Sequence, residues 1–386
     1  MKRIGVIDNL IDIQSLLENK YHNCNAAEVM KATGGNTGNV AFVFGVRQII
    51  KNPVTRIGWG WTPDVVKQRV DHLVVCCANQ IGAHADLSGW ADKLEMFGLP
   101  VTLIGLGAQS ESYEIKPIVP EGTKNFLSVV NAFRANPDSS NIGVRGEFTQ
   151  KTLQSLGFES VRTGCPSLMI SKDQELGKNI LKRQGDTRYK KIAVAAGNPW
   201  HGSSAFLESI LVDVVDKYSG AYILQHPESM LQIAYGEIEN ITENTINHFL
   251  KIYGDHFNFE KMLAWYRRNA YVFIDAPNWM RFLDKFDAVI GSRYHGVALA
   301  LQHTIPGCVF TIDSRTQELC DETAIKSIHV SKLKEFGADD LIDVARWTAD
   351  EVDCFDSNRN AKAGVFINFL IANEIVPSDH LICMDS

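Results

Sequence analysis

The chain has 386 residues, of which 45% are hydrophobic and 22% charged, and its formal net charge at pH 7 is -7. This length exceeds what one hydrophobic core usually organises, so two domains are expected, and the ordinary composition excludes a disordered or low-complexity chain. The acidic balance excludes a long-range field that attracts nucleic acid or anionic lipid, so local cations must hold any anion.

The N-terminus gives no sign of export. Residues 1–10 lack the basic, apolar and small-residue sections of a signal peptide, and no apolar run of about 18 residues predicts a membrane span. The eight cysteines are scattered, without a CxxC motif or a Cys/His spacing typical of metal ligands. We therefore expect a cytoplasmic protein with reduced thiols and no metal site.

Short β-branched runs alternate with helix-length amphipathic segments, a pattern typical of parallel sheets. The expected strands are almost entirely apolar, as in strands covered on both faces: His72 to Ala78, Val101 to Leu106, Ile192 to Ala196, Ala221 to Leu224, Tyr271 to Ile274, Ala288 to Ile290 and Cys308 to Ile312. Apolar spacings of three and four predict helices at Asn39 to Lys51, Gly89 to Phe97, Gly146 to Leu156, Ser203 to Lys217, Phe259 to Arg268, Trp279 to Phe286 and Lys362 to Ala372.

A polar segment, Ser171 to Lys191, lies between two strand-rich halves, and the domain boundary is expected within it. It divides the chain into an N-terminal domain of residues 1–175 and a C-terminal domain of residues 176–386. Periodicity leaves open whether the final helix crosses back to the first domain.

The most informative strand end lies between residues 287 and 301, where an apolar strand stops at Gly291 and an apolar helix resumes by Val297. The turn contains Arg293 and His295, whose spacing of two can direct both side chains to one side. Arginine offers a planar fork for a carboxylate or phosphate, and histidine exchanges a proton near neutral pH. The alternative is an arginine paired with a carboxylate at the domain interface and a histidine that caps the helix.

Other strand ends carry weaker signals. Arg145 precedes a helix whose first turn contains Glu147, and these two can simply pair with each other. The glycine-rich residues 33–39 lead into a helix, so their amides can hold an anion or a sugar hydroxyl, although no phosphate-binding P-loop is present. Residues 105–109 form a similar turn, for which close packing of strand and helix is the alternative.

Aromatic and histidine side chains complete the candidates. Trp59 and Trp61 can stack on a sugar or simply pack in the protein. The histidines that follow strands of the second half, His201 and His226, can face the cleft or serve as caps. Structural roles are expected for three others: His72, His303 and His380.

The Gly-Ser-Arg-Tyr-His-Gly segment between strand and helix, residues 291–296, resembles the R-x-H signature of the polysaccharide pyruvyl transferase family. The similarity extends, in the order found in the family, to residues 34–39, 100–109, 144–147 and 164–168. Asn39 stands where the family usually has aspartate, so that loop is assigned no catalytic carboxylate.

This resemblance implies an α/β fold of two Rossmann-like domains facing a cleft, in a glycosyltransferase-B-like arrangement. It also implies transfer of pyruvate from phosphoenolpyruvate to a sugar of a cell-surface polysaccharide or its lipid-linked precursor, forming a ketal and releasing phosphate. The implied catalytic residues are His295 and Arg293; the donor-binding residues are Arg145, Arg293, Gly38, Asn39, Gln109 and Ser292; and the acceptor side is assigned Asn36, Gln225 and His226.

No cofactor beyond the donor, and no nucleic-acid partner, is expected, whereas peripheral membrane association is left open by a lipid-linked acceptor. Two other functions remain open from the sequence. One is a nucleotide-sugar glycosyltransferase of related fold. The other is a non-catalytic sugar-phosphate binding protein.

Overall fold

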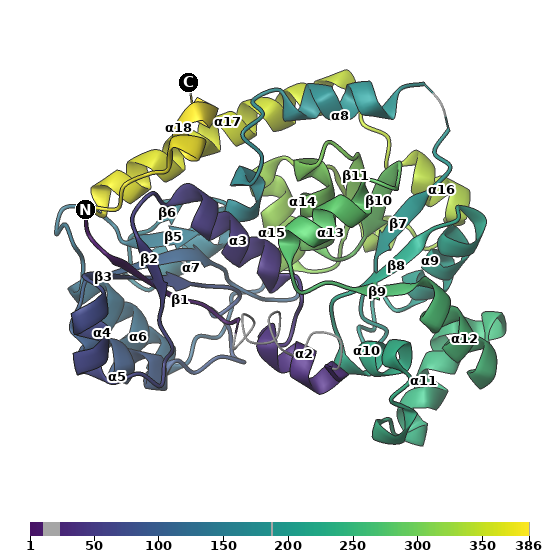
Figure 1. The fold of residues 1–386 in the computed structure, drawn as a ribbon, viewed down its shortest axis with the longest axis horizontal. Helices are drawn as coiled ribbons and strands as arrows, with labels where there is room; N and C mark the ends of the chain where they lie inside the picture. The colour runs from purple at the N-terminus through teal and green to yellow at the C-terminus, as the bar shows by residue number, and fades with distance from the viewer. Residues whose placement is uncertain (11–23, 187, 386) are drawn as a thin grey trace.

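The computed structural model describes residues 1–10, 24–186 and 188–385, which form two parallel six-stranded sheets, each covered by helices (Figure 1). The first sheet has the order β2-β1-β3-β4-β5-β6, and its strands are β1 (Ile4–Ile7), β2 (Val54–Arg56), β3 (His72–Cys76), β4 (Val101–Leu106), β5 (Ile142–Val144) and β6 (Val161–Arg162). The second has the order β12-β11-β10-β7-β8-β9, and its strands are β7 (Ile192–Ala195), β8 (Ala221–Leu224), β9 (Ala270–Val272), β10 (Ala288–Gly291), β11 (Gly307–Thr311) and β12 (Ser327–His329).

Helices connect successive strands, as parallel pairing requires. Those of the first half are α2 (Ala26–Ala32), α3 (Asn39–Ile49), α4 (Pro63–Arg69), α5 (Ser88–Phe97), α6 (Glu121–Ala132) and α7 (Glu147–Ser155). Those that follow are α8 (Leu176–Gln184), α9 (Phe206–Lys217), α10 (Glu228–Tyr235), α11 (Glu243–Tyr253), α12 (Phe259–Asn269), α13 (Ala276–Leu283), α14 (Tyr294–Gln302), α15 (Ser314–Thr323), α16 (Ala338–Asp343), α17 (Ala349–Ala372) and α18 (Asp379–Asp385). The expected class, two Rossmann-like domains in a glycosyltransferase-B-like arrangement, is confirmed.

The two halves share a hydrophobic core. One continuous cluster of buried side chains joins α3 of the first half to α14 of the second, through the short 3-10 helix η3 (Pro166–Met169). Two further clusters fill the outer faces of the two sheets. The halves are therefore held together by apolar packing as well as by their covalent connection.

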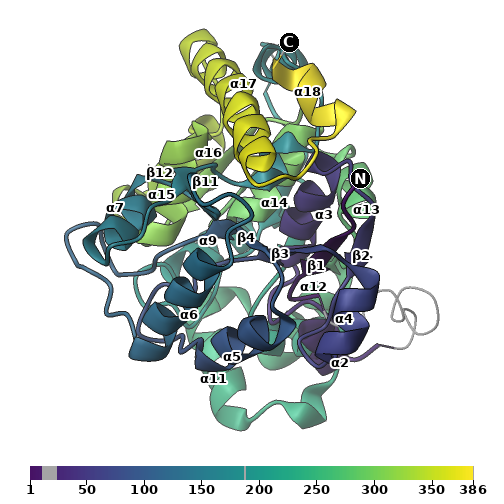
Figure 2. The ribbon, with the colours of Figure 1, turned by 90° about the vertical axis from the view of Figure 1, so that its left-hand side faces the viewer.

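Both ends of the chain cross between the halves. Helix α2 precedes the first half's helix α3 but packs on α10, and its apolar side chains belong to the core of the second sheet (Figure 1). Helix α17 packs along α8 (Figure 1), and the segment after it returns to the first half, where Asn373 Nδ2 donates to Ser140 O at 3.0 Å. Helix α18 then lies beside α17 and contacts α3 (Figure 2). The first sheet ends at Arg162 and the second begins at Ile192; the boundary after residue 175 stays a prediction.

Several sequence predictions were wrong in detail. No helix was predicted in residues 171–191, but they contain α8, which buries Leu176 and Ile180 beside α17. The helix predicted from Lys362 to Ala372 is α17, which begins at Ala349, since Val352 and Phe355 are buried although polar residues surround them; α18 after it was not predicted. Strand β9 ends at Val272 rather than at residue 274, and four strands were not predicted: β1, β2, β6 and β12.

The structure also bears on membrane spans and disulfides. In the described part of the chain, no helix is both long and apolar enough to cross a membrane. All eight cysteines lie in the described ranges, and no disulfide joins any two of them.

Gly45 sets how closely α3 approaches η3. A Cβ at this position would lie 2.3 Å from the backbone oxygen of Pro166 and 2.8 Å from the backbone nitrogen of Ser167. We expect Gly45→Ala to lower the free energy of unfolding by about 1–3 kcal/mol, because backbone cannot move aside as a flexible side chain can. The measurement is chemical denaturation of both proteins.

The matched control is Gly89→Ala in α5, where an added Cβ meets nothing within 4 Å. This change should be neutral or stabilise by about 0.5–1 kcal/mol, because alanine favours a helix over glycine. If Gly45→Ala unfolds at the same denaturant concentration as the control, the packing of α3 on η3 does not constrain the fold.

Candidate active site

The site lies where the strand order of each sheet reverses. In the second sheet, β9-β8-β7-β10-β11-β12, the chain enters at the central strand β7, and the direction in which strands are added changes between β7 and β10. In the first sheet this direction changes between β1 and β3. Ligands of open parallel sheets bind outside the carboxyl ends of the strands at such points, because the loops diverge there and leave a crevice. Gly197 and Arg293 follow β7 and β10, and Asn79 lies just beyond β3.

One pocket, with an empty volume of about 580 Å³, collects side chains from both halves. Its lining contains three arginines, one histidine and four side-chain amides. The residues are Asn36, Asn39, Ala78, Asn79, Arg145, Gln225, Ser292, Arg293, Tyr294, His295, Ile312, Arg315, Thr316 and Leu319.

Arg145 is buried at the end of β5 without a carboxylate partner among the described residues. Its Nε donates to Gly105 O at 2.9 Å and its Nη1 to Asn79 Oδ1 at 2.5 Å. Burial lowers the pKa of this guanidinium. The simple alternative, a pair with Glu147, is wrong, because Glu147 instead pairs with Lys151 and Arg162.

Arg293 is the residue before α14, and it is partly buried on the pocket wall. Its Nη2 donates to Gly197 O at 3.3 Å and to His226 O at 3.1 Å, while its buried Nε has no hydrogen-bond partner among the described residues. Burial, and then the charge of Arg315, lower its pKa to about 10. Like Arg145, this cation is held by neutral oxygen atoms, and the alternative of a carboxylate ion pair is wrong for the described residues.

The sequence analysis missed Arg315, the third arginine of the pocket. It lies in the first turn of α15, directly beyond β11, and its Nη2 forms an ion pair with Asp313 Oδ2 at 2.6 Å. The search of strand ends that found Arg293 could have found it, because a cation follows an apolar strand in both places. Its carboxylate partner makes it less available to a ligand than the other two.

His295 lies in the first turn of α14, where its ring faces the pocket. Burial and the charge of Arg145 lower its pKa to about 3, so the imidazole is neutral near pH 7. Its Nε2 lies 3.8 Å from the Sγ of Cys165, a buried residue that sequence reasoning had placed only within a matching segment. His295 does not cap the helix: Arg293 holds the capping position and forms no side-chain cap.

The remaining candidates divide into two groups. Asn36, Asn39, Gln225 and Ser292 line the pocket, and Gly38 lies against them, since a Cβ there would be 2.5 Å from Gln225 Oε1. Two others are not lining residues. Gln109 donates its backbone N–H to Ile81 O, and His226 Nδ1 lies 3.1 Å from Gly35 O.

The other aromatic and histidine candidates have partners of their own. Trp59 stacks on Trp90 with 4.7 Å between ring centroids, which favours packing over a sugar contact. The three histidines expected to be structural contact Thr102, Asp284 and the carbonyl of Met169, in that order along the chain. Within the described ranges, no group of three or more histidine, cysteine, aspartate or glutamate side chains is arranged to hold a metal ion.

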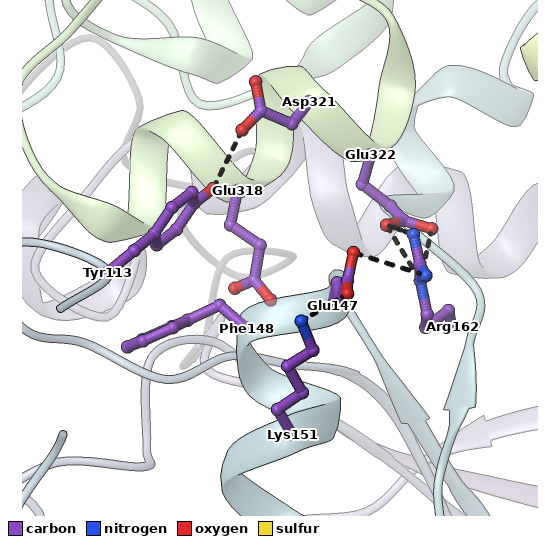
Figure 3. A pocket seen from close by; sticks show the side chains of 8 residues that line it. All are labelled: Tyr113, Glu147, Phe148, Lys151, Arg162, Glu318, Asp321 and Glu322. Carbon is purple, nitrogen blue, oxygen red and sulfur yellow. Dashed lines mark hydrogen bonds and ion pairs between the residues drawn. The ribbon is translucent and has the colours of Figure 1, made fainter.

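A second pocket lies between α7 and α15, and Figure 3 shows its charged lining. It contains four carboxylates and two cations, a formal charge of -2 by subtraction: Glu147, Glu318, Asp321 and Glu322 with Lys151 and Arg162. Its carboxylates already accept hydrogen bonds or ion pairs from neighbouring residues (Figure 3). An acidic pocket of this kind disfavours a multiply charged anion, whereas the pocket with Arg145, Arg293 and Arg315 carries three cations.

The fold and the arginine pocket define a two-domain α/β protein with three arginines and a neutral histidine in a pocket between two Rossmann-like domains. The chain belongs to the polysaccharide pyruvyl transferase family, whose profile matches residues 15–314. No curated protein matches the chain at a significant level.

Solved structures align with most of the chain at low identity and low TM-score. UDP-GlcNAc 2-epimerase from Neisseria meningitidis, bound to UDP-GlcNAc, is 10% identical, with 97% of this chain and 100% of that chain covered and a TM-score of 0.41. Anabaena HepE in complex with UDP and glucose is 12% identical, with 97% and 98% covered and a TM-score of 0.40. The Streptomyces nogalater glycosyltransferase SnogD is 10% identical, with 93% and 95% covered and a TM-score of 0.34. At these TM-scores the similarities support no conclusion about the site.

Arg145→Lys tests whether the planar fork matters. Lysine keeps the charge but cannot contact Gly105 O, Asn79 and an anion at the same time, so we expect binding of inorganic phosphate to weaken by about 2–5 kcal/mol. Calorimetric titration with phosphate measures this loss.

The control is Arg162→Lys in the acidic pocket, where the arginine already pairs with Glu322. It should leave phosphate binding unchanged. Wild-type phosphate affinity in Arg145→Lys would remove Arg145 from the anion site.

Proposed function

We propose that this protein transfers pyruvate from phosphoenolpyruvate to two hydroxyls of a saccharide, as a cyclic ketal, and releases phosphate. The observation that supports this most directly is the convergence of Arg145, Arg293 and His295 on one pocket, with both arginines lacking a carboxylate partner among the described residues. The acceptor is a sugar of a cell-surface polysaccharide or of its lipid-linked precursor. The proposal places the reaction in the cytoplasm, and peripheral contact with a membrane follows only if the acceptor is lipid-linked.

The charge of the donor suits this pocket. Phosphoenolpyruvate carries a carboxylate and a phosphate, and a guanidinium binds either group through two parallel hydrogen bonds. A cation buried without a counter-ion is costly, and a bound anion relieves that cost. We assign donor binding to Arg145 and Arg293, with Arg315 as a third cation at the rim and Asn39 and Ser292 as neutral contacts.

The reaction balances without an oxidant or a reductant. A proton added to the C3 methylene of the donor makes a methyl group and leaves positive charge at C2. The first sugar hydroxyl adds to C2 and loses its proton, after which the bond from C2 to the phosphate oxygen breaks and the electron pair leaves with phosphate. The second hydroxyl then adds to C2 and loses its proton, so one hydroxyl proton replaces the proton used at C3 and the other leaves with phosphate.

His295 is the group we assign to these proton transfers. Its neutral state in the empty pocket means that it cannot donate a proton until its pKa rises. Bound phosphate and carboxylate favour the imidazolium form, because they offset the charge of Arg145. Binding of the donor therefore protonates His295, which then acts as the acid. The neutral imidazole that remains after donation can accept a hydroxyl proton. On the acceptor side, Asn36 and Gln225 present amides to the pocket, and His226 lies behind them.

His295→Gln should lower kcat by about 10²- to 10⁴-fold, with little loss of affinity for phosphoenolpyruvate, because the assigned role is proton transfer. Since the acid form is required, kcat of the wild type should fall as pH rises above the pKa of His295 in the donor complex, and the variant should lose this limb. The measurements are single-turnover phosphate release and donor affinity across pH.

Proton uptake on donor binding gives an independent reading. Calorimetry in buffers of different ionisation enthalpy should show more proton uptake by the wild type than by His295→Gln, because His295 begins unprotonated and gains a proton with the donor. Equal uptake and an unchanged pH profile would contradict the assignment. A wild-type protein that binds nucleotide sugars but not phosphoenolpyruvate would overturn the proposed donor.

A further inference from the structure

A carboxylate lies directly behind Arg293, outside the pocket lining. Glu208 is in the first turn of α9 and is only 1% exposed. Its Oε1 accepts a hydrogen bond from the backbone nitrogen of Gly197 at 3.0 Å, and the backbone oxygen of Gly197 accepts one from Arg293 Nη2 at 3.3 Å. One residue therefore links the carboxylate to the arginine.

The linking residue has no room for a side chain. A Cβ on Gly197 would lie 2.3 Å from Glu208 Oε1 and 2.5 Å from Ser292 Oγ. The carboxylate, the turn after β7 and the turn after β10 are thus in close contact. A shift of Glu208 would change where the Gly197 carbonyl, and with it Arg293, is held.

The other side of Glu208 faces buried hydroxyls. Tyr222 of β8 donates to Oε2, its hydroxyl oxygen lies 3.4 Å from that of Tyr253 on α11, and Tyr253 contacts Tyr266 on α12. Burial raises the pKa of Glu208 to about 7, while Tyr222 and the charge of Arg293 act in the opposite direction. This carboxyl group therefore titrates near neutral pH, beside an arginine assigned to the donor.

We propose that Glu208 is a positioning residue that holds Arg293 through Gly197, and that it takes up a proton when an anion binds to Arg293. The proposal deepens the proposed function, on which it rests for the identity of the anion.

The sign follows from charge. In the empty pocket, Arg293 favours the ionised carboxylate, whereas Arg315 and Asp313 act on Arg293 itself with opposite signs. An anion on Arg293 offsets the positive charge that Glu208 feels, so it raises the pKa of Glu208. By linkage, the proton on Glu208 makes anion affinity highest below about pH 7, which is the pKa of Glu208 without the anion. Above this pH the affinity falls, by at most about tenfold per pH unit for one coupled proton.

The experiment measures the affinities of phosphoenolpyruvate and inorganic phosphate by calorimetry from pH 5.5 to 8.5, a window of about three units around this pKa. Glu208→Gln keeps an oxygen for Gly197 and cannot ionise, so it should bind within about threefold of the wild type at low pH. Above pH 7 the ratio of wild-type to variant affinity should fall, and this ratio removes the ionisation of phosphate and of His295, which both proteins share. Glu208→Ala removes the support of Gly197 and should bind at least about tenfold more weakly at every pH.

Two further variants separate coupling from a general structural effect. Tyr222→Phe removes a hydrogen bond to the ionised carboxylate, so the decline in affinity should begin at higher pH. The matched control, Glu243→Gln, changes an acid in the first turn of α11 and should keep the wild-type profile. Melting temperatures show whether each variant is folded.

The outcomes are distinct. A Glu208→Gln variant with the wild-type pH dependence overturns the proton coupling, and a folded Glu208→Ala variant with wild-type affinity overturns the positioning role. Failure of the wild type to bind phosphoenolpyruvate overturns the proposed donor instead, and the phosphate titrations still decide the role of Glu208.

Discussion

The structure depends on holding two positively charged side chains, buried Arg145 and partly buried Arg293, beside one pocket. Arg145 and Arg293 donate to backbone or amide oxygen atoms, and neither has a carboxylate within ion-pair distance among the described residues. Such charges are tolerated only if the surrounding backbone cannot relax away from them. The loops that hold them leave the carboxyl ends of parallel strands, which is where open α/β sheets bind their ligands.

Rigidity between the two halves serves the same end. The site needs Arg145 from the first sheet and His295 from the second, and the Sγ of Cys165 contacts the imidazole from the connecting segment. The apolar core shared by α3, η3 and α14 fixes these three sources relative to one another. Interiors packed in this way resist small displacements, so the charges stay in place when the pocket is empty.

Sequence reasoning succeeded where local pattern decides the structure. Short apolar runs become strands buried on both faces, and a strand followed at once by a helix locates Arg293 and His295. It failed where contacts distant in the chain decide, as in α8, whose helix depends on α17. It had no local signal for Glu208, which reads as an ordinary first-turn acid until the fold brings Gly197 and Tyr222 to it. Gln109 stays a prediction: its backbone N–H donates to Ile81 O, and it is not among the residues that line the pocket.

The placement of α2 gives the protein an interlocked topology. Its apolar side chains complete the core of the second sheet, although more than a hundred residues of the first half separate the two in sequence. A fragment of residues 1–175 would contain α2 but not the second sheet on which α2 packs. The complementary fragment, residues 176–386, would expose the apolar surface that α2 covers. The second half therefore reaches its final packing only after the first residues of the chain are available, which makes the two sheets cooperative units of one folding reaction.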